Sequence, residues 1–169
     1  MPNRIVRLFL QEAGRRYDLN RGLTPYSAMT DDLKERFGNA CAYCGVPFSE
    51  VSLVEEHLVP INRSSAGLHS WGNIVPACRE CNRLKADHPW DRHPRLNEAR
   101  RAVIRDYIDE FHYAPNVKEL LNVLDKLYGL SDQQTRGLVE FALWASRPYI
   151  DGLGQSQRRT SSTVVLTND

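Results

Sequence analysis

Two Cys-x-x-Cys pairs constrain the fold of this chain more than any other feature of its sequence. Cys41 and Cys44 form the first pair, and Cys78 and Cys81 form the second. This spacing lets both thiolates of a pair point at one ion, and two such pairs are typical of a tetrahedral zinc site. The chain has four cysteines, so none lies outside the pairs. The segment between the pairs, residues 45–77, is longer than a zinc ribbon needs and has room for structure of its own.

The expected compartment decides between zinc and disulfides. No signal segment opens the chain and no apolar run is long enough to span a membrane, so we expect a cytoplasmic protein without a membrane partner. In a reducing cytosol four paired cysteines favour zinc over disulfides. A thioredoxin-like redox site is the alternative, but it needs only one pair in a strand–helix setting. With 41% hydrophobic and 25% charged residues, the composition is that of a soluble globular protein.

Patterns between the cysteine pairs predict a small α+β unit. Residues 53–59 have the apolar content of a strand that Pro60 closes, and Ile74-Val75 suits a second, short strand. An irregular loop is expected at residues 61–72 and a helix at residues 80–87. The expected order is therefore strand, loop, strand and helix, with zinc joining the two ends.

Helical patterns flank this unit on both sides. A helix over residues 4–16, with Gly14 ending its helical pattern, and a second one from Asp31 to Phe37 capped by Thr30, are expected before it. Three helices are expected after it, at residues 96–112, residues 116–128 with Gly129 as C-cap, and from Ser131 towards Pro148. The expected organisation is an N-terminal helical segment (1–37), a core (38–90), a C-terminal helical annex (91–150) and a flexible tail (151–169).

The distribution of charge indicates a polyanionic partner. The net charge is only +1, but basic residues gather in residues 1–21 and 83–105. A nearly neutral protein with basic segments beside its site suits a polyanion that is held locally. Solvated helix faces explain each cluster equally well. The candidate nucleic-acid contacts are Arg83, Lys85, Arg95, Arg100 and Arg101.

The adjacent residues Glu56 and His57 are the best candidates for chemistry. Hydrolysis of a phosphodiester needs a base for the attacking water and a divalent cation on the phosphoryl oxygens. Side chains of neighbouring strand residues point to opposite faces, so one ion could not easily take both. This geometry gives the two residues different tasks.

Together with the cysteines, these residues resemble a known family. Glu56-His57-x-x-Pro60, then Asn73, then Cys78-x-x-Cys81-Asn82-x-x-Lys85, is similar to the HNH endonucleases of the zinc-stapled ββα-metal type, over roughly residues 38–90. The resemblance implies that His57 is the general base, that Glu56 and Asn82 bind the catalytic ion, and that Asn73 orders the loop and helps to orient the base. The chain is thus an H-N-N version. It departs from the family in the loop, where Ala66-Gly67 stands in place of Gly-Gly.

The sequence leaves alternatives for individual positions. Glu55 is adjacent to Glu56, and only the family pattern prefers Glu56 as a ligand. His69, His88 and His93 are further candidates for metal or phosphate contacts. Each of these residues also has an ordinary structural explanation as a surface, turn or ion-paired side chain.

The resemblance implies a metal-dependent endonuclease that hydrolyses phosphodiester bonds in DNA and nicks one strand per active site. The implied ions are a structural Zn²⁺ and a catalytic Mg²⁺ or Mn²⁺, and the implied partner is DNA, with a protein partner or second copy at the annex. A zinc-ribbon module that binds nucleic acid without catalysis and a nuclease that acts on RNA are the alternatives. Restriction, phage defence, homing and phage DNA processing are all compatible roles.

Overall fold

The computed structural model describes residues 2–156, with side chains over residues 4–144. The chain divides into two compact units between Tyr128 and Gly129. Among the described helices, none is both long enough and apolar enough to cross a bilayer.

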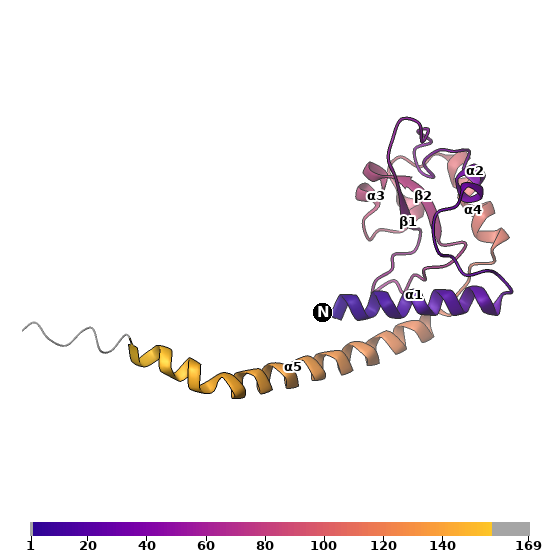
Figure 1. Cartoon of the computed structure of the whole chain (residues 1–169). Coiled ribbons are helices and arrows are strands. Elements are labelled where there is room, and N and C mark those ends of the chain that lie inside the picture. The colour runs from indigo at the N-terminus through magenta and orange to yellow at the C-terminus, as the bar shows by residue number, and fades with distance from the viewer. Residues whose placement is uncertain (1, 157–169) are drawn as a thin grey trace, which may run out of the picture. The chain divides into compact units, whose positions relative to one another are not determined.

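The centre of the first unit is a β-hairpin followed by a short helix (Figure 1). Strand β1 (Leu53–His57) pairs antiparallel with β2 (Ile74–Cys78), so that Leu53 lies opposite Cys78 and His57 lies opposite Ile74. Helix α3 (Arg79–Lys85) begins directly after β2, with the Cys78 side chain as its N-cap. The expected ββα core is therefore confirmed, and β2 is longer than the sequence indicated.

Strand β2 continues through Pro76, beyond the Ile74-Val75 pair that the sequence assigned to it. Pro76 lies opposite Glu55 in the register, and its carbonyl accepts the Ala42 N–H at 2.9 Å, away from β1. In an antiparallel strand the N–H and C=O of one residue point to the same side. The missing N–H of Pro76 therefore faces away from the hairpin, and the ladder loses nothing.

Two helices pack onto the hairpin and the cysteines in one hydrophobic core. Helix α2 (Asp31–Arg36) begins at Thr30, whose side chain accepts the Leu33 N–H as expected. Helix α4 (Glu98–Glu110) begins at Asn97, and a 3₁₀ turn (η1, Trp90–Arg92) precedes it. The core contains residues from all of these segments, among them Leu33, Phe37, Tyr43, Leu58, Ile74, Val75, Ile104 and Tyr107. Segments before and after residues 38–90 thus pack together with the ββα core.

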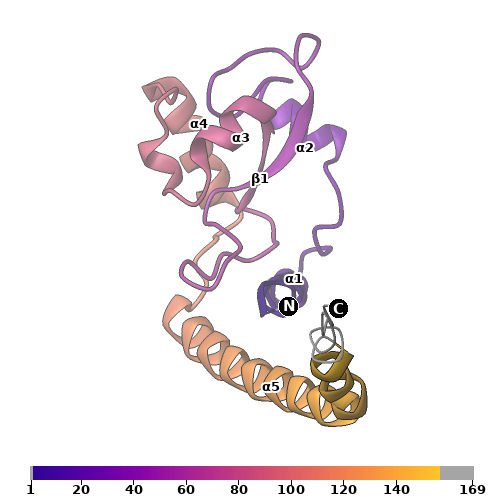
Figure 2. The same cartoon turned by 90° about the vertical axis from the view of Figure 1, so that its left-hand side faces the viewer.

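A second core joins helix α1 (Pro2–Asn20) to the loop after β1 and to the start of helix α5 (Val117–Ser156). Its buried members are Val6, Leu10, Ala66, Leu68 and Leu124. Figure 2 shows α1 end-on, next to this loop. The loop that separates the two strands is therefore packed against helices and has a fixed path.

Gly14 was expected to end the first helix, but α1 continues through it to Asn20. A Cβ atom at Gly14 would lie 2.2 Å from the His69 carbonyl oxygen. The glycine is therefore needed for the close approach of α1 to the loop. In that loop Ala66 has φ +53°, so alanine adopts a left-handed conformation at the position where the family often has its first glycine.

The helical annex differs from the prediction. One helix, α5, replaces the two expected at residues 116–128 and 131–148, so the assignments of Gly129 as C-cap and Ser131 as N-cap are wrong. Glycine lowers helix stability by only about 1 kcal/mol, which apolar residues on either side can offset. Part of the expected flexible tail, residues 151–156, belongs to α5, and residues 157–169 lie outside the described residues.

Candidate active site

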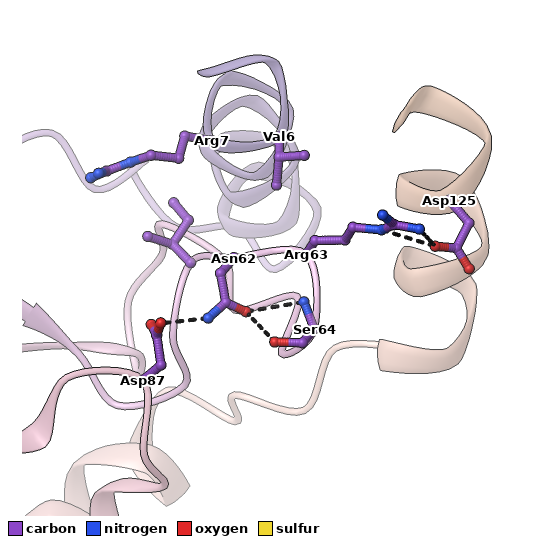
Figure 3. A pocket seen from close by; sticks show the side chains of 8 residues that line it. Val6, Arg7, Asn62, Arg63, Ser64, Asp87 and Asp125 are labelled. Atoms are coloured by element: carbon purple, nitrogen blue, oxygen red, sulfur yellow. Dashed lines mark hydrogen bonds and ion pairs between the residues drawn. The ribbon is translucent and has the colours of Figure 1, made fainter. Parts of the chain in front are cut away.

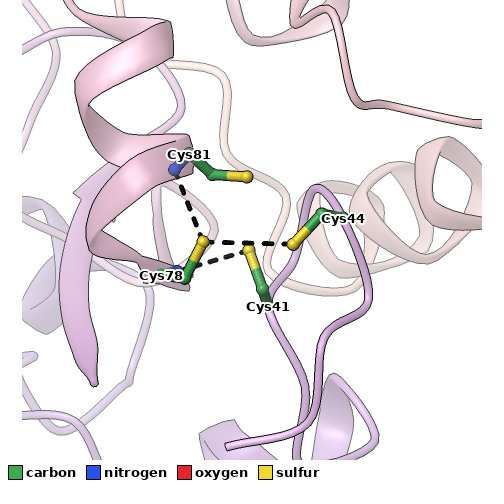
Figure 4. Close-up of side chains that lie close together, drawn as sticks. All are labelled: Cys41, Cys44, Cys78 and Cys81. Atoms are coloured by element: carbon green, nitrogen blue, oxygen red, sulfur yellow. Dashed lines mark hydrogen bonds between the residues drawn. The ribbon is translucent and has the colours of Figure 1, made fainter. Parts of the chain in front are cut away.

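The four cysteines converge on one point between β2, α3 and the turn that holds Cys41 and Cys44 (Figure 4). Their sulfur atoms all lie within 4.8 Å of one another, and Cys44 Sγ lies 3.9 Å from Cys78 Sγ. Four thiolates at about 2.3 Å from a tetrahedral Zn²⁺ would be about 3.8 Å apart. The donor set and its spacing therefore fit a structural zinc ion that joins the two ends of the ββα core.

Backbone donors around the cluster favour thiolate at Cys41. Burial alone would raise the pKa of Cys41, but backbone N–H groups of Cys44, Cys78 and Tyr43 lower it below its usual value. The Cys78 N–H lies 3.3 Å from Cys41 Sγ. These N–H groups fix the orientation of the thiolate that a zinc ion would bind.

Arg100 of α4 holds the first cysteine turn in place. Its guanidinium donates to the carbonyl of Cys41 at 2.9 Å, to that of Ala42 at 3.1 Å and to that of Phe37 at 3.3 Å. The sequence proposed Arg100 as a contact to nucleic acid. In the structure its donors are used within the protein, so we assign it to supporting the zinc site.

The strand alternation of β1 separates Glu56 from His57, as expected. Glu56 is buried, and its Oε1 forms an ion pair with Lys85 Nζ of α3 at 2.8 Å. Burial raises the pKa of Glu56, and the Lys85 ammonium acts against this shift. The two side chains link β1 to the helix that packs on it. Lys85 is only 1% exposed, so its ammonium faces Glu56 and not a nucleic acid.

Asn82 lies one turn before Lys85 on α3 and is half-buried. Residues three apart share a helix face, so Asn82 lies on the side of α3 that turns towards Glu56. A carboxylate and an amide oxygen are hard ligands of the kind that Mg²⁺ prefers. Lys85 pairs with Oε1 of Glu56, and the backbone N–H of His57 also hydrogen-bonds to this carboxylate.

Asn73 fixes the chain just after β1. It is fully buried, and its Oδ1 accepts the Val59 N–H at 2.8 Å. Its Nδ2 donates to the Val59 carbonyl at 3.1 Å and to the Leu68 carbonyl at 2.7 Å. One amide therefore links Val59 and Leu68 of the loop to the start of β2.

His57 lies at the end of β1 and contacts a residue that the sequence offered only as an alternative. Its Nε2 is 3.1 Å from Nδ1 of His69. Burial lowers the pKa of His57 to about 3, and the charges of His69, Arg7 and Lys85 act in the same direction. His57 is therefore neutral at physiological pH and has a lone pair that can accept a proton. An approaching phosphate would raise this pKa.

An open cavity of about 730 Å³ lies between α1, the loop and the end of α3 (Figure 3). Its lining residues include Arg7, Asn62, Arg63, Asp87 and Asp125. Arg63 is paired with Asp125 at 2.9 Å, and Asn62 donates to Asp87 at 3.0 Å. Arg7 both lines the cavity and affects His57, which connects this cavity electrostatically to the candidate base. The sequence placed Arg7 only in the basic segment at residues 1–21, because its position beside the loop depends on the packing of α1.

The remaining predicted nucleic-acid contacts differ in their surroundings. Arg95 forms a bidentate pair with Glu80 at 2.6 and 2.8 Å. Arg101 is paired with Glu98 at 3.3 Å and also donates to the Asp91 carbonyl. Arg83 is exposed on α3. Arg83 is thus the best placed of the predicted set to contact a polyanion.

Comparisons with known proteins agree with this geometry. Residues 41–88 match the family model described as HNH endonuclease. Septu protein PtuB of Bacillus thuringiensis is 29% identical over a match of 107 aligned positions, and the match covers 56% of this chain and 41% of that protein. The match thus spans less than half the length of this relative. The resemblance inferred from the sequence is therefore confirmed by the family-model match at residues 41–88.

Proposed function

We propose that this chain is a metal-dependent endonuclease that hydrolyses phosphodiester bonds in DNA and nicks one strand per active site. The observation that carries the proposal is the position of His57, a half-buried histidine at the end of β1, beside the loop that Asn73 fixes. A zinc-ribbon binding module has no need for this arrangement.

His57 acts as the general base in this proposal. Its neutral ring accepts the proton of the water that attacks phosphorus, while Asn73 keeps the loop and the end of β1 in place. Glu56 and Asn82 would hold a Mg²⁺ or Mn²⁺ ion on the hairpin side of α3. When bound, such an ion supplies a Lewis acid that stabilises charge on the phosphoryl and leaving oxygens.

Nicking of supercoiled plasmid tests the proposal. Zinc-loaded protein should convert the plasmid to open circles when Mg²⁺ is added, and His57→Ala should lower the rate by about 10² to 10⁴. His88→Ala is the matched control, because His88 is exposed. Asn82→Ala should instead need more Mg²⁺ and recover part of its activity as the metal concentration rises. Binding of DNA without cleavage, with any divalent metal, would support the binding-module alternative.

DNA as the substrate is supported by the family resemblance and by basic residues near the site. Single-stranded and duplex RNA of the same sequence are the comparison substrates, and faster cleavage of RNA would reverse the assignment. Arg83 is the proposed contact on α3, so Arg83→Glu should weaken DNA binding. It should also reduce the slope of log affinity against log salt concentration by about 1, the effect of losing one phosphate contact.

We propose phage defence as the role, on the basis of the similarity to Septu protein PtuB. We also propose that the second unit binds a protein partner or another copy of this chain. Large apolar side chains are exposed along this part of α5, including Leu130, Leu138, Phe141 and Trp144. The efficiency of phage plating with and without His57→Ala tests the role. The interface is tested by comparing the molecular mass in solution of the wild type with that of Leu138→Ser.

A further inference from the structure

His69 contacts the candidate base directly, although it belongs to none of the three HNH positions. It lies in the loop between the strands, four residues before Asn73. Its Nδ1 is 3.1 Å from Nε2 of His57, and the two ring planes are tilted by 43°. This distance is that of a hydrogen bond, so one ring donates and the other accepts.

The position of His69 is fixed independently of His57. Its N–H donates to the Leu10 carbonyl of α1 at 3.4 Å, and Gly14 allows α1 to approach its backbone. The His69 ring packs edge-on against Tyr26, with ring centroids 5.1 Å apart.

Tyr26 is itself held at both ends. Its N–H donates to the buried carboxylate of Asp18 at 2.9 Å, and its hydroxyl donates to Glu55 at 2.8 Å. Ser70, next to His69, donates to the same Asp18 at 2.8 Å. His69 is therefore a fixed group against which the His57 ring is oriented.

The hydrogen bond has a consequence for the proton on His57. A neutral imidazole carries one N–H, and the nitrogen that bears it is set by the partner of the ring. If His69 Nδ1 accepts, His57 is protonated at Nε2 and its Nδ1 keeps a free lone pair. If His69 Nδ1 donates, the proton of His57 sits on Nδ1, and its only lone pair is used within the pair. Only the first arrangement leaves His57 able to take a proton from water.

We infer that His69 is a positioning residue: its Nδ1 accepts the Nε2–H of His57, which orients the ring and leaves His57 Nδ1 as the basic atom. The choice between the two tautomers rests on the proposed nuclease function, because only this one leaves His57 able to act as a base. The hydrogen bond and the tautomer can be measured without any reaction.

Asparagine provides a sharp substitution, because its side-chain oxygen can lie where Nδ1 of histidine lies. His69→Ala removes the acceptor, whereas His69→Asn restores it without a second ring. His69→Ala should slow single-turnover nicking on the order of 10²-fold, the effect of a misplaced reacting group, and His69→Asn should recover most of that loss. If His69 only filled space, His69→Leu would recover the nicking rate as well as His69→Asn does. His69→Leu is therefore the matched control.

The tautomer is measured by long-range ¹H–¹⁵N NMR on the zinc-loaded full chain, with His57→Gln to assign the signals. We expect the wild-type His57 to carry its proton on Nε2, and His69→Ala to lose this preference while thermal unfolding remains cooperative. A proton on Nδ1 of wild-type His57 would overturn the inference, and so would a His69→Asn variant that is folded but as slow as His69→Ala. If the wild type cuts no nucleic acid, the nuclease proposal fails, and the NMR result still decides the role of His69.

Discussion

The Lys85 ammonium lies 2.8 Å from the Glu56 carboxylate, and both side chains are buried. Removing one partner of such a pair leaves a buried charge without compensation, which typically costs about 3–5 kcal/mol. We therefore expect Lys85→Met to lower the free energy of unfolding by this amount in urea denaturation at neutral pH. The double variant Glu56→Gln/Lys85→Met should recover most of the loss, because no unpaired charge remains.

The same variants test whether Glu56 binds the catalytic ion. Without Lys85, the Glu56 carboxylate loses the ammonium that competes with a metal cation for it. Mg²⁺ should then raise the melting temperature of Lys85→Met more than that of the wild type, and should not raise that of the double variant. An equal response of all three proteins to Mg²⁺ would remove Glu56 from the list of ligands.

Zinc should be part of the folded structure. The four sulfur atoms within 4.8 Å connect the start of the core to α3, so the free energy of zinc binding contributes directly to folding. We expect one tightly held Zn²⁺ per chain by elemental analysis, and loss of cooperative unfolding in Cys41→Ser and Cys78→Ser. Folded protein that contains no zinc would contradict this assignment.

Asn73 should be required for the stability of the loop as well as for activity. Asn73→Ala leaves the Val59 N–H and the Val59 and Leu68 carbonyls without their partner, and unsatisfied buried groups cost about 1–3 kcal/mol each. The expected result is a destabilisation of several kcal/mol with slower cleavage. Asn82→Ala is the control, because it should change the metal response with little loss of stability.

The zinc site and the ββα core could be predicted from the sequence, because cysteine spacing and strand–turn–helix order are local features. The cap at Thr30 is of the same kind. The lengths of α1 and α5 could not be predicted in this way. Gly14 and Gly129 look like helix ends in the sequence, but Gly14 allows a contact with a distant loop, and a 40-residue helix continues through Gly129.

For the candidate site, the sequence predicted the chemical types better than the contacts. The alternation of Glu56 and His57 follows from the period of a strand. The inward direction of Lys85, the use of Arg100 at the cysteine turn and the approach of His69 to His57 depend on packing between segments far apart in the chain. Charge patterns alone do not distinguish a lysine that turns inward from one that faces solvent.

The role of Gly14 can be tested against a glycine that has no close neighbour. Gly14→Ala places a methyl group 2.2 Å from the His69 carbonyl oxygen, so α1 or the loop must shift. We expect a loss of about 1–3 kcal/mol in stability, together with slower nicking because His69 moves. At Gly129 an added Cβ meets nothing within 4 Å, so Gly129→Ala should leave activity unchanged and stabilise α5 by about 0.5–1 kcal/mol. Circular dichroism during thermal unfolding measures the stability of both variants, and the plasmid-nicking assay measures their activity.

The low pKa of His57 predicts a pH dependence of stability. In the unfolded chain His57 takes up a proton near pH 6.5, whereas burial holds its pKa at about 3 in the folded protein. Between these values the unfolded state binds more protons, so the free energy of unfolding falls as the pH is lowered. Relative to His57→Gln, the wild type should lose about 1 kcal/mol between pH 6.5 and pH 5.5. Zinc is present in both proteins, so its own pH dependence cancels in the difference. A flat difference for His57→Gln would mean that the His57 ring is solvated in the folded protein.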